Sequence, residues 1–191
     1  MTQFYKLKKL TDCKWINYFD IVFKRDGNAP RAWHMCSRKE NPIADANKAD
    51  AVVIVPIIKT ALGNRLVVTK EFRVPIWDYE YGFPAGLIDR DENIAETVKR
   101  ELKEETGLDL IKINQVSRPV YSSAGMSDES CVMVMAEAGG EVSNEWLEDM
   151  EDIETLLMDV EQIRAILASE SKISAKAWGL FYHYAAAGEI E

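Results

Sequence analysis

The chain has 191 residues, a formal net charge of −9 at pH 7, a hydrophobic content of 47% and a charged content of 29%. This length can bury one good core with a small appendage, and the composition is that of a soluble globular protein. No apolar run approaches the ~20 residues that span a bilayer, and the acidic balance disfavours non-specific binding to nucleic acid. A nucleotide substrate is still compatible with this charge, because metal ions can supply the local positive charge.

The cysteines and histidines give no sign of a metal centre. Cys13, Cys36 and Cys131 are odd in number and lack metal-site spacing, so we expect reduced, mostly buried thiols in a cytoplasmic protein. The first fifteen residues contain no apolar core of a signal peptide. His34 and His183 are isolated, and we interpret them as packing or surface residues.

The N-terminal part predicts a β-hairpin. Residues 15–23 are aromatic and β-branched, residues 26–30 (DGNAP) form a turn, and residues 31–38 return as a second strand. A hairpin of this size is not stable alone, so it must pack on the rest of the chain or on a second subunit. The polar segment 39–47 follows as a linker.

The remaining chain alternates between apolar runs and helical segments. The expected strands are residues 50–58, 65–72, 111–121, 131–138 and 153–160, and the expected helices are residues 94–106, 161–169 and 175–187. Two loops, 122–129 and 139–152, lie between strands, and the second has a length that often carries function. Strands that enclose one internal helix, with helices closing the chain, predict a mixed-sheet α/β sandwich.

The helix at 94–106 is strongly acidic. Residues 91–93 supply capping groups at its start, and Gly107 falls where a helix ends. Glu101, Glu104 and Glu105 share one face, where their repulsion would be relieved by a divalent cation such as Mg²⁺. The alternative is an ordinary solvated acidic helix.

The spacing around this helix resembles the Nudix box. Gly86 is followed after five residues by Glu92, and after seven more by Arg100-Glu101-Leu102, Glu104-Glu105 and Gly107-Leu108. The resemblance implies an α/β/α sandwich with a mixed sheet, plus a small N-terminal antiparallel β region. It also implies a dimerising, base-binding region at residues 1–46 and a Nudix hydrolase domain at residues 47–191.

The resemblance also assigns roles to the box residues. Glu101 and Glu105 would be the main metal ligands, Glu104 would bridge or act from a second shell, and the carbonyl of Ala85 would complete the site. Gly86 would let the loop before the helix turn tightly. Arg100 and Glu92 would orient the ligands. The metal would be Mg²⁺, with Mn²⁺ as the alternative.

The catalytic base lies outside the box. In the branch that cleaves ADP-ribose, a glutamate in the loop before the last strand serves, and we favour Glu151, with Asp149 as runner-up. Five carboxylates lie between residues 145 and 152, so a solvated acidic loop is the alternative for each of them.

Three further features resemble the ADP-sugar diphosphatases. The run from Glu71 to Pro75 followed by residues 81–89 leads into the box, and Arg73 would contact the diphosphate. Residues 122–129 (SSAGMSDE) resemble a substrate loop that contains Met126, although the family usually has proline where this chain has Ala124.

The third feature is a pair of tryptophans. Trp15 and Trp33 lie 18 residues apart on the two hairpin strands and would stack on both faces of an adenine, while Arg38 matches a substrate-contacting position. The alternative role of the tryptophans is in the hairpin core or a dimer interface. In this family the hairpin commonly exchanges across a two-fold homodimer.

The resemblance therefore implies Mg²⁺-dependent hydrolysis of ADP-ribose or a related ADP-sugar to AMP and a sugar phosphate. The alternative is a GDP-mannose or other nucleotide-sugar (NDP-X) diphosphatase. A non-catalytic, nucleotide-sensing Nudix module is disfavoured because the box is intact. We expect a small-molecule nucleotide sugar as ligand, a homodimer, and neither nucleic-acid nor membrane binding.

Overall fold

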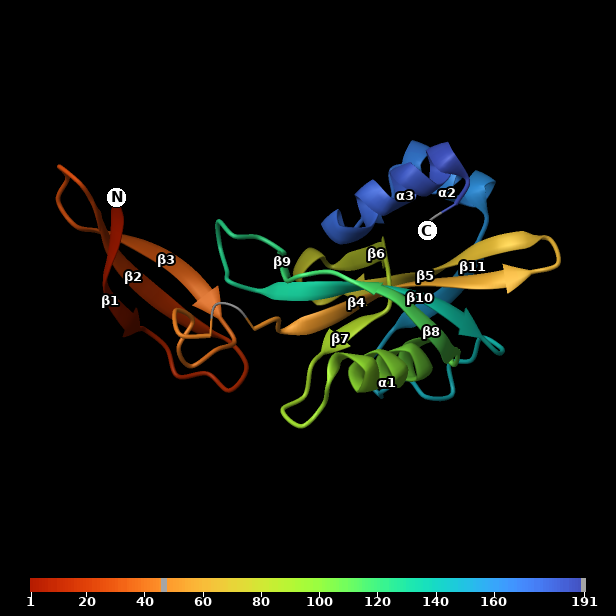
Figure 1. Cartoon of the computed structure of the whole chain (residues 1–191), viewed down its shortest axis with the longest axis horizontal. Helices are drawn as coiled ribbons and strands as arrows, with labels where there is room; N and C mark the ends of the chain where they lie inside the picture. Colours follow the sequence, from red (N-terminus) through yellow and green to blue (C-terminus); the bar gives the residue numbers. More distant parts are fainter. Residues whose placement is uncertain (46–47, 190–191) are drawn as a thin grey trace. The chain divides into compact units, whose positions relative to one another are not determined.

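A computed structural model describes residues 1–45 and 48–189 (Figure 1). The expected boundary between residues 46 and 47 therefore lies outside the described residues. The chain divides into two compact units: the first contains Met1–Asp50 and Pro119–Cys131, and the second contains Ala51–Arg118 and Val132–Glu191. In the described part of the chain, no helix is long and apolar enough to cross a membrane.

The first unit is built on an antiparallel sheet in the order β1–β2–β3. Its strands are β1 (Thr2–Lys9), β2 (Asn17–Arg25) and β3 (Arg31–Ser37). The sequence-based hairpin missed β1, because the alternating lysines of this strand form no buried face. The short strand β9 (Val120–Tyr121) pairs with Ser130 and Cys131 at the start of β10.

One expected placement in this unit is wrong. Trp33 lies on β3, where it pairs with Ile21, but Trp15 lies before the first residue of β2. The side chain of Asn17 accepts a hydrogen bond from the N–H of Cys13 at 2.7 Å and donates one to the carbonyl of Cys13 at 2.8 Å. These bonds turn the chain immediately before β2, so the two tryptophans do not lie on paired strands.

The second unit contains a mixed sheet in the order β12-β6-β5-β4-β10-β8, with β11 paired to β5 and β7 to β4. Its strands are β4 (Ala51–Thr60), β5 (Gly63–Arg73), β6 (Asp78–Gly82), β7 (Ala85–Leu87), β8 (Asp109–Val116), β10 (Ser130–Gly139), β11 (Ile153–Met158) and β12 (Lys172–Ile173). A short 3-10 turn, η1 (Val74–Ile76), joins β5 to β6. The sheet is mixed: β12 runs parallel to β6, whereas both β6 and β11 run antiparallel to β5.

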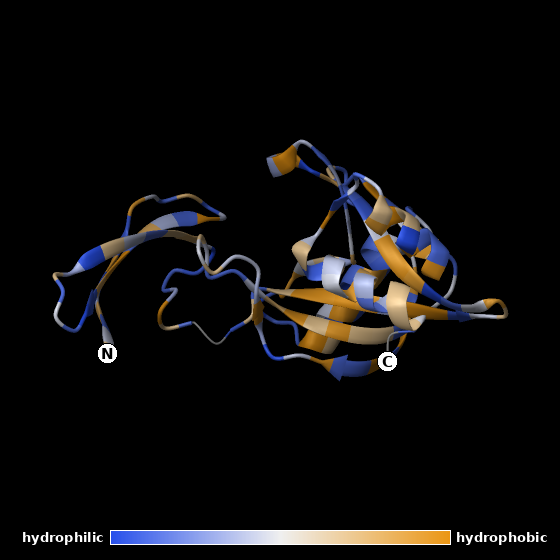
Figure 2. Ribbon diagram, turned by 90° about the horizontal axis from the view of Figure 1, so that it is seen from above, coloured by the Kyte–Doolittle hydropathy of each residue, from blue (hydrophilic) through white to orange (hydrophobic). Residues whose placement is uncertain are grey.

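Helices cover both faces of this sheet, which confirms the predicted α/β/α sandwich (Figure 1). Helix α1 (Ile94–Thr106) lies on one face against β4, β7 and β11. Helices α2 (Val160–Ala168) and α3 (Ala175–Ala187) lie on the other face, packed together and against β11 and β6. Hydrophobic residues run along the central strands between these layers (Figure 2). Fully buried members of the core include Ile54, Leu66, Val68, Leu102 and Phe181.

Both ends of α1 are capped as the sequence predicts. The side chain of Asn93 accepts hydrogen bonds from the N–H groups of Ala95 and Glu96, and Glu96 completes the capping box. Gly107 ends the helix in the left-handed region, at φ 73°. A Cβ at this glycine would also lie 2.6 Å from the backbone nitrogen of Ser143, so residue 107 must be glycine for two independent reasons.

The packing of α3 yields a stability prediction. The ring of Phe181 is fully buried and meets Phe83 edge-on at 5.3 Å between centroids. Phe181→Ala should lower the free energy of unfolding by about 3–5 kcal/mol, because a cavity replaces the ring. Leu62→Ala, in a turn where the side chain is exposed, should change it by less than about 0.5 kcal/mol. Urea denaturation of both variants measures the difference, and equal losses would contradict the predicted packing.

Candidate functional site

Glu101 is buried where α1 approaches β7 most closely. Its carboxylate occupies the space beside Gly86, where a Cβ would lie 1.8 Å from Oε1 of Glu101. Gly86 is not among the residues with positive φ, so the tight turn that we expected there is wrong. The position requires glycine because any side chain would displace the carboxylate. Burial raises the pKa of Glu101, opposed by Arg100, while Glu104 and Glu151 raise it further.

Glu105 lies one turn further along the helix and is only 6% exposed. The N–H of Ala85 donates a hydrogen bond to Oε2 of Glu105 at 2.9 Å, which places this carboxylate against the same strand. Burial raises the pKa of Glu105 well above its usual value, and the charges of Glu101, Glu71 and Glu151 raise it further. The hydrogen bond from the Ala85 N–H lowers this pKa, but by less than burial raises it. A carboxylate that is buried with so little compensation will readily take up a proton or a cation.

Arg100 links the acidic side chains of the box. Its Nε and Nη2 donate to both oxygens of Glu92 at 2.8 and 2.9 Å. Its Nη1 donates to Glu101 at 2.7 Å and to Glu104 at 3.0 Å, and Nη2 also donates to the carbonyl of Leu87. The hydrogen bonds from Arg100 lower the pKa of Glu92 to about 2, so Glu92 is fully ionised at neutral pH. The guanidinium thus holds the loop before α1 and two carboxylates of the helix in one arrangement.

Two glutamates from outside the helix belong to the same electrostatic cluster. Glu71 lies on β5, and its pKa is raised by burial, opposed by Arg73 and reinforced by Glu151 and Glu80. Glu151 lies just before β11, and its carboxylate accepts a hydrogen bond from the N–H of Glu148 at 2.9 Å. Of the two candidate bases, Glu151 is the one whose charge raises the pKa of Glu71, Glu101 and Glu105. Asp149 is exposed in the same loop.

We call Glu71, Glu101, Glu105 and Glu151 the carboxylate cluster. All its donor atoms are oxygens, which suit a hard divalent cation, and its members repel one another, which a cation would relieve. Among residues 1–45 and 48–189, no three His, Cys, Asp or Glu side chains already stand at metal-binding distances. Oxygens of Glu101 and Glu105 bond instead to Arg100 and to the Ala85 N–H, so loading a cation requires these side chains to shift.

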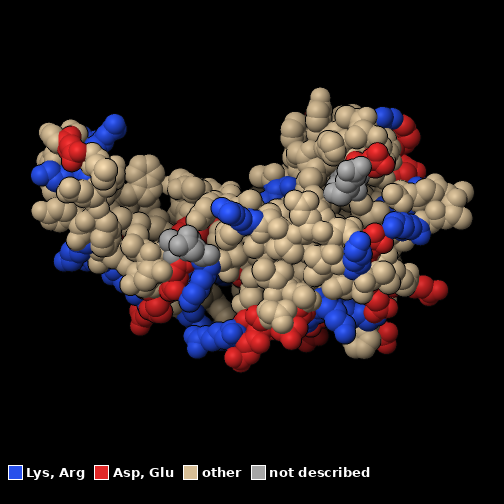
Figure 3. All heavy atoms as spheres, viewed as in Figure 1, with Lys and Arg blue, Asp and Glu red and all other residues tan. Residues whose placement is uncertain are grey.

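Acidic side chains also gather on the surface over α1 and the loop that precedes it (Figure 3). The exposed members of this group include Asp89, Asp91 and Glu96, whereas the carboxylate cluster is part-buried beneath. Each exposed carboxylate attracts cations toward this part of the surface, although Arg90, Lys99 and Lys103 lie among them.

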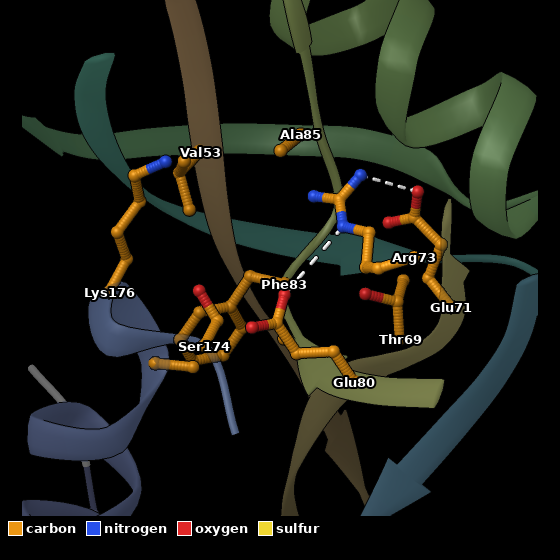
Figure 4. Close-up of a pocket in the computed structure, with 11 residues that line it drawn as sticks. Val53, Thr69, Glu71, Arg73, Glu80, Phe83, Ala85, Ser174 and Lys176 are labelled. Carbon is orange, nitrogen blue, oxygen red and sulfur yellow. Dashed lines mark hydrogen bonds and ion pairs between the residues drawn. The ribbon is translucent and has the colours of Figure 1, made fainter. Parts of the chain in front are cut away.

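Arg73 lies beside the cluster at the end of β5. Its guanidinium bonds to Glu71 at 2.6 Å and pairs with Glu80 at 3.6 Å, and it lines a small pocket with Ala85 and Lys176 (Figure 4). The cavity volume is only ≈ 30 Å³, so it admits about one water-sized group rather than a whole ligand.

Sequence reasoning did not assign roles to Glu71, Glu80 or Lys176. Glu71 belongs to the run that leads into the box, and its alternation with Arg73 along β5 is a usable signal, since residues i and i+2 face the same way on a strand. Lys176 lies in the first turn of α3, 70 residues beyond the end of the helix of the box, and no local pattern marks it.

The first unit brings together three of the residues expected to bind substrate. The indole Nε1 of Trp33 donates to the carbonyl of Gly125 at 3.3 Å, and the N–H of Cys36 donates to the carbonyl of Met126 at 2.9 Å. Arg38 pairs with Glu129 at 3.7 Å. β3 and the residue that follows it therefore lie against loop 122–129. Trp15 is 66% exposed and carries the ammonium of Lys14 over its ring.

The chain is similar to proteins of known family. The family model described as NUDIX domain matches residues 47–178. A Caenorhabditis elegans protein named as a nudix hydrolase is 28% identical over 180 residues, which cover 87% of this chain and 80% of that protein. The ADP-ribose pyrophosphatase of Saccharomyces cerevisiae is 32% identical over 133 residues, which cover 69% of this chain and 56% of that protein.

A solved structure shares the fold. The crystal structure of an ADP compounds hydrolase superposes with a TM-score of 0.75 at 18% identity, over 99% of this chain and 97% of that one. Together with the family match, which spans the carboxylate cluster and both layers of helices apart from the end of α3, this shows that the chain belongs to the Nudix family.

Proposed function

We propose that this protein hydrolyses the diphosphate bond of ADP-ribose or a related ADP-sugar, with Mg²⁺ as the cofactor and Mn²⁺ as the alternative. The observation that carries the proposal is the carboxylate cluster. Burial raises the pKa of Glu101 and of Glu105, and the charge of Glu101 raises that of Glu105 further, so their negative charges destabilise the fold. A bound cation would relieve this destabilisation. Diphosphate hydrolysis uses divalent cations, so the cluster suits that reaction.

The reaction requires a water molecule to attack one phosphorus atom while the bridging P–O bond breaks. A bound divalent cation neutralises the phosphate oxygens and lowers the pKa of a water molecule. Glu101, Glu105 and the carbonyl of Ala85 would hold this cation, and Glu104 would support them. Glu151 accepts the proton of the attacking water. The second product leaves as a phosphate, so no strong general acid is required.

Chain residues also orient the substrate. Arg73 donates to the diphosphate oxygens, because a planar guanidinium suits such oxygens and its two glutamate partners hold it at the edge of the cluster. Arg100 orients Glu101 and Glu104 through the hydrogen bonds already described.

The choice of ADP-sugars is supported by the names of the yeast relative and of the structural neighbour, and by the group of Trp33, Arg38 and Met126 in the first unit. We propose that Trp33 stacks on the adenine. Trp15 completes this stack from the second subunit of a homodimer, in which residues 1–46 form the interface. The cytoplasmic location expected from the cysteines is part of the same proposal.

The experiment that tests the proposal is an assay of the purified protein with Mg²⁺ on ADP-ribose, ADP-glucose, GDP-mannose, NADH and dNTPs, with product identification. We expect AMP and ribose phosphate as the products from ADP-ribose. We also expect ADP-ribose to be hydrolysed faster than GDP-mannose. A preference for GDP-mannose would keep the metal site and reject the adenine pocket.

The carboxylate cluster makes Glu105 the sharpest test of the metal site. Glu105→Gln should lower kcat by on the order of 100-fold or more, because an amide holds a cation far less well. The melting temperature should change little or rise, since a buried charge is removed. Glu96→Gln is the matched control on the same helix, because glutamine preserves the capping box. Full activity in the Glu105 variant would mean that the metal assignment is wrong.

The raised pKa values of Glu71, Glu101 and Glu105 predict a pH-dependent effect of the metal. A carboxyl whose pKa is raised by folding favours the fold while protonated, and this stability is lost as the pH rises through the folded-state pKa. Cations bind the deprotonated form. The gain in melting temperature from Mg²⁺ over EDTA should therefore be larger at about pH 8 than at about pH 5. A gain that is independent of pH would refute the prediction.

The adenine pocket yields a separate prediction. Trp33→Ala should raise the KM for ADP-ribose by about 10- to 100-fold, with kcat little changed, because stacking on a base is worth about 1–3 kcal/mol. Trp178→Ala, at an exposed tryptophan on α3, serves as the control and should leave the KM unchanged. Steady-state kinetics separate the two parameters. An unaltered KM in the Trp33 variant would mean that the adenine does not bind in this unit.

A further inference from the structure

A part-buried lysine in the first unit makes contacts that the Nudix box does not explain. Nζ of Lys39 lies 3.2 Å from Oδ2 of Asp50 and 3.3 Å from Oδ2 of Asp128. The three side chains are 10%, 9% and 17% exposed, respectively. One cation therefore serves two carboxylates, which come from positions 78 residues apart in the chain.

The same group is joined to the backbone of β10. Oδ2 of Asp50 accepts a hydrogen bond from the N–H of Ser130 at 2.9 Å, and the N–H of Asp50 donates to the carbonyl of Ser130 at 2.8 Å. Ser130 is fully buried. Asp50 is thus fixed in place independently of Lys39, and the lysine connects this fixed point to Asp128 on the loop.

Loop 122–129 depends on few other contacts of this strength. Residues 122–126 and 128 carry no buried apolar side chain, and Met126 is 69% exposed. Trp33 and Cys36 on β3 make hydrogen bonds to this loop, and Arg38 makes an ion pair with it. All three residues are partly exposed. Partly exposed contacts of this kind contribute little each, whereas a buried, charge-assisted pair is costly to break.

The lysine cannot be replaced by a neutral residue without consequence. Burial alone would lower its pKa, but Asp50 and Asp128 raise it above the usual value, so the ammonium stays charged. Without that charge, two carboxylates would face each other in a part-buried site, and the loop would separate from Asp50 to relieve the repulsion.

We propose that Lys39 is a positioning residue for substrate binding: by tethering Asp128 to Asp50, it holds loop 122–129 against Trp33 and Arg38. This inference rests on the proposed function, in which these residues bind the nucleotide. Lys39 does not touch the reacting atoms, so its loss weakens substrate binding and leaves the chemical step intact.

The test compares Lys39→Met, Lys39→Arg and Asp128→Asn in the full-length protein. The methionine variant should raise the KM for ADP-ribose about tenfold with kcat within about twofold of the parent, and the arginine variant should restore most of the KM. Asp128→Asn keeps the Lys39–Asp50 pair and cuts only the tether, so it reports on the loop even where Lys39→Met folds poorly. Lys59→Met, which removes a lysine that is 66% exposed and pairs with Glu137 outside residues 1–46, is the control and should match the parent.

Hydrogen exchange supplies a readout that does not depend on turnover. The amide of Cys36, which donates to Met126, should lose protection in Lys39→Met and Asp128→Asn, while the amides of β4 and β5 keep theirs. Unchanged exchange at Cys36, or an unchanged KM, would overturn the proposed role of Lys39. Loss of protection without any ADP-ribose turnover by the parent protein would support the tether and reject the proposed substrate.

Discussion

The close approach of α1 to β7 is the constraint on which the site depends. Because residue 86 has no side chain, the carboxylate of Glu101 reaches the strand, and Glu105 then comes within hydrogen-bonding distance of the Ala85 N–H. Hydrophobic packing supplies the force that keeps the helix there, through Val98 and Leu102, which are fully buried on the same element. The apolar face of one helix therefore holds its acidic residues in a position that their own charges oppose.

Arg100 compensates part of the negative charge in this site. One guanidinium donates to Glu92, Glu101 and Glu104 and so offsets much of their repulsion. Glu105 receives no such partner from Arg100 and has only a backbone N–H, which agrees with its markedly raised pKa. The charges are thus unequally compensated, and the least compensated carboxylate lies deepest in the fold. A multivalent cation gains the most by binding at that point.

Much of this arrangement could be predicted from residues close together in the sequence. The capping of α1, its acidic face and the glycine at its end follow from local rules, and the structure shows each of them. The strands β4, β5, β10 and β11 are also confirmed to within a few residues at their ends, because apolar β-branched runs such as residues 50–58 are distinctive. The short strands β7 and β12 were not expected, and the expected strand 111–121 is divided into β8 and β9.

Features that depend on contacts between distant segments were missed or given the wrong cause. β1 escaped notice because its alternating lysines form no buried face. The expected turn at Gly86 was wrong because the requirement comes from Glu101, fifteen residues away. The membership of Glu71 in the carboxylate cluster depends on the pairing of β5 with β11, which brings Ile153 opposite Glu71, and no local pattern predicts that register.

The composition of the first unit bears on how the chain can be divided. The unit consists of residues 1–50 together with residues 119–131, an excursion from the middle of the chain. The excursion holds Asp128 and the N-terminal segment holds Lys39, so neither segment alone contains both partners of this ion pair. Removal of residues 1–50 would leave residues 119–131 on the remaining unit without the sheet that they contact. Any shortened form of the protein must therefore keep both segments or lose both.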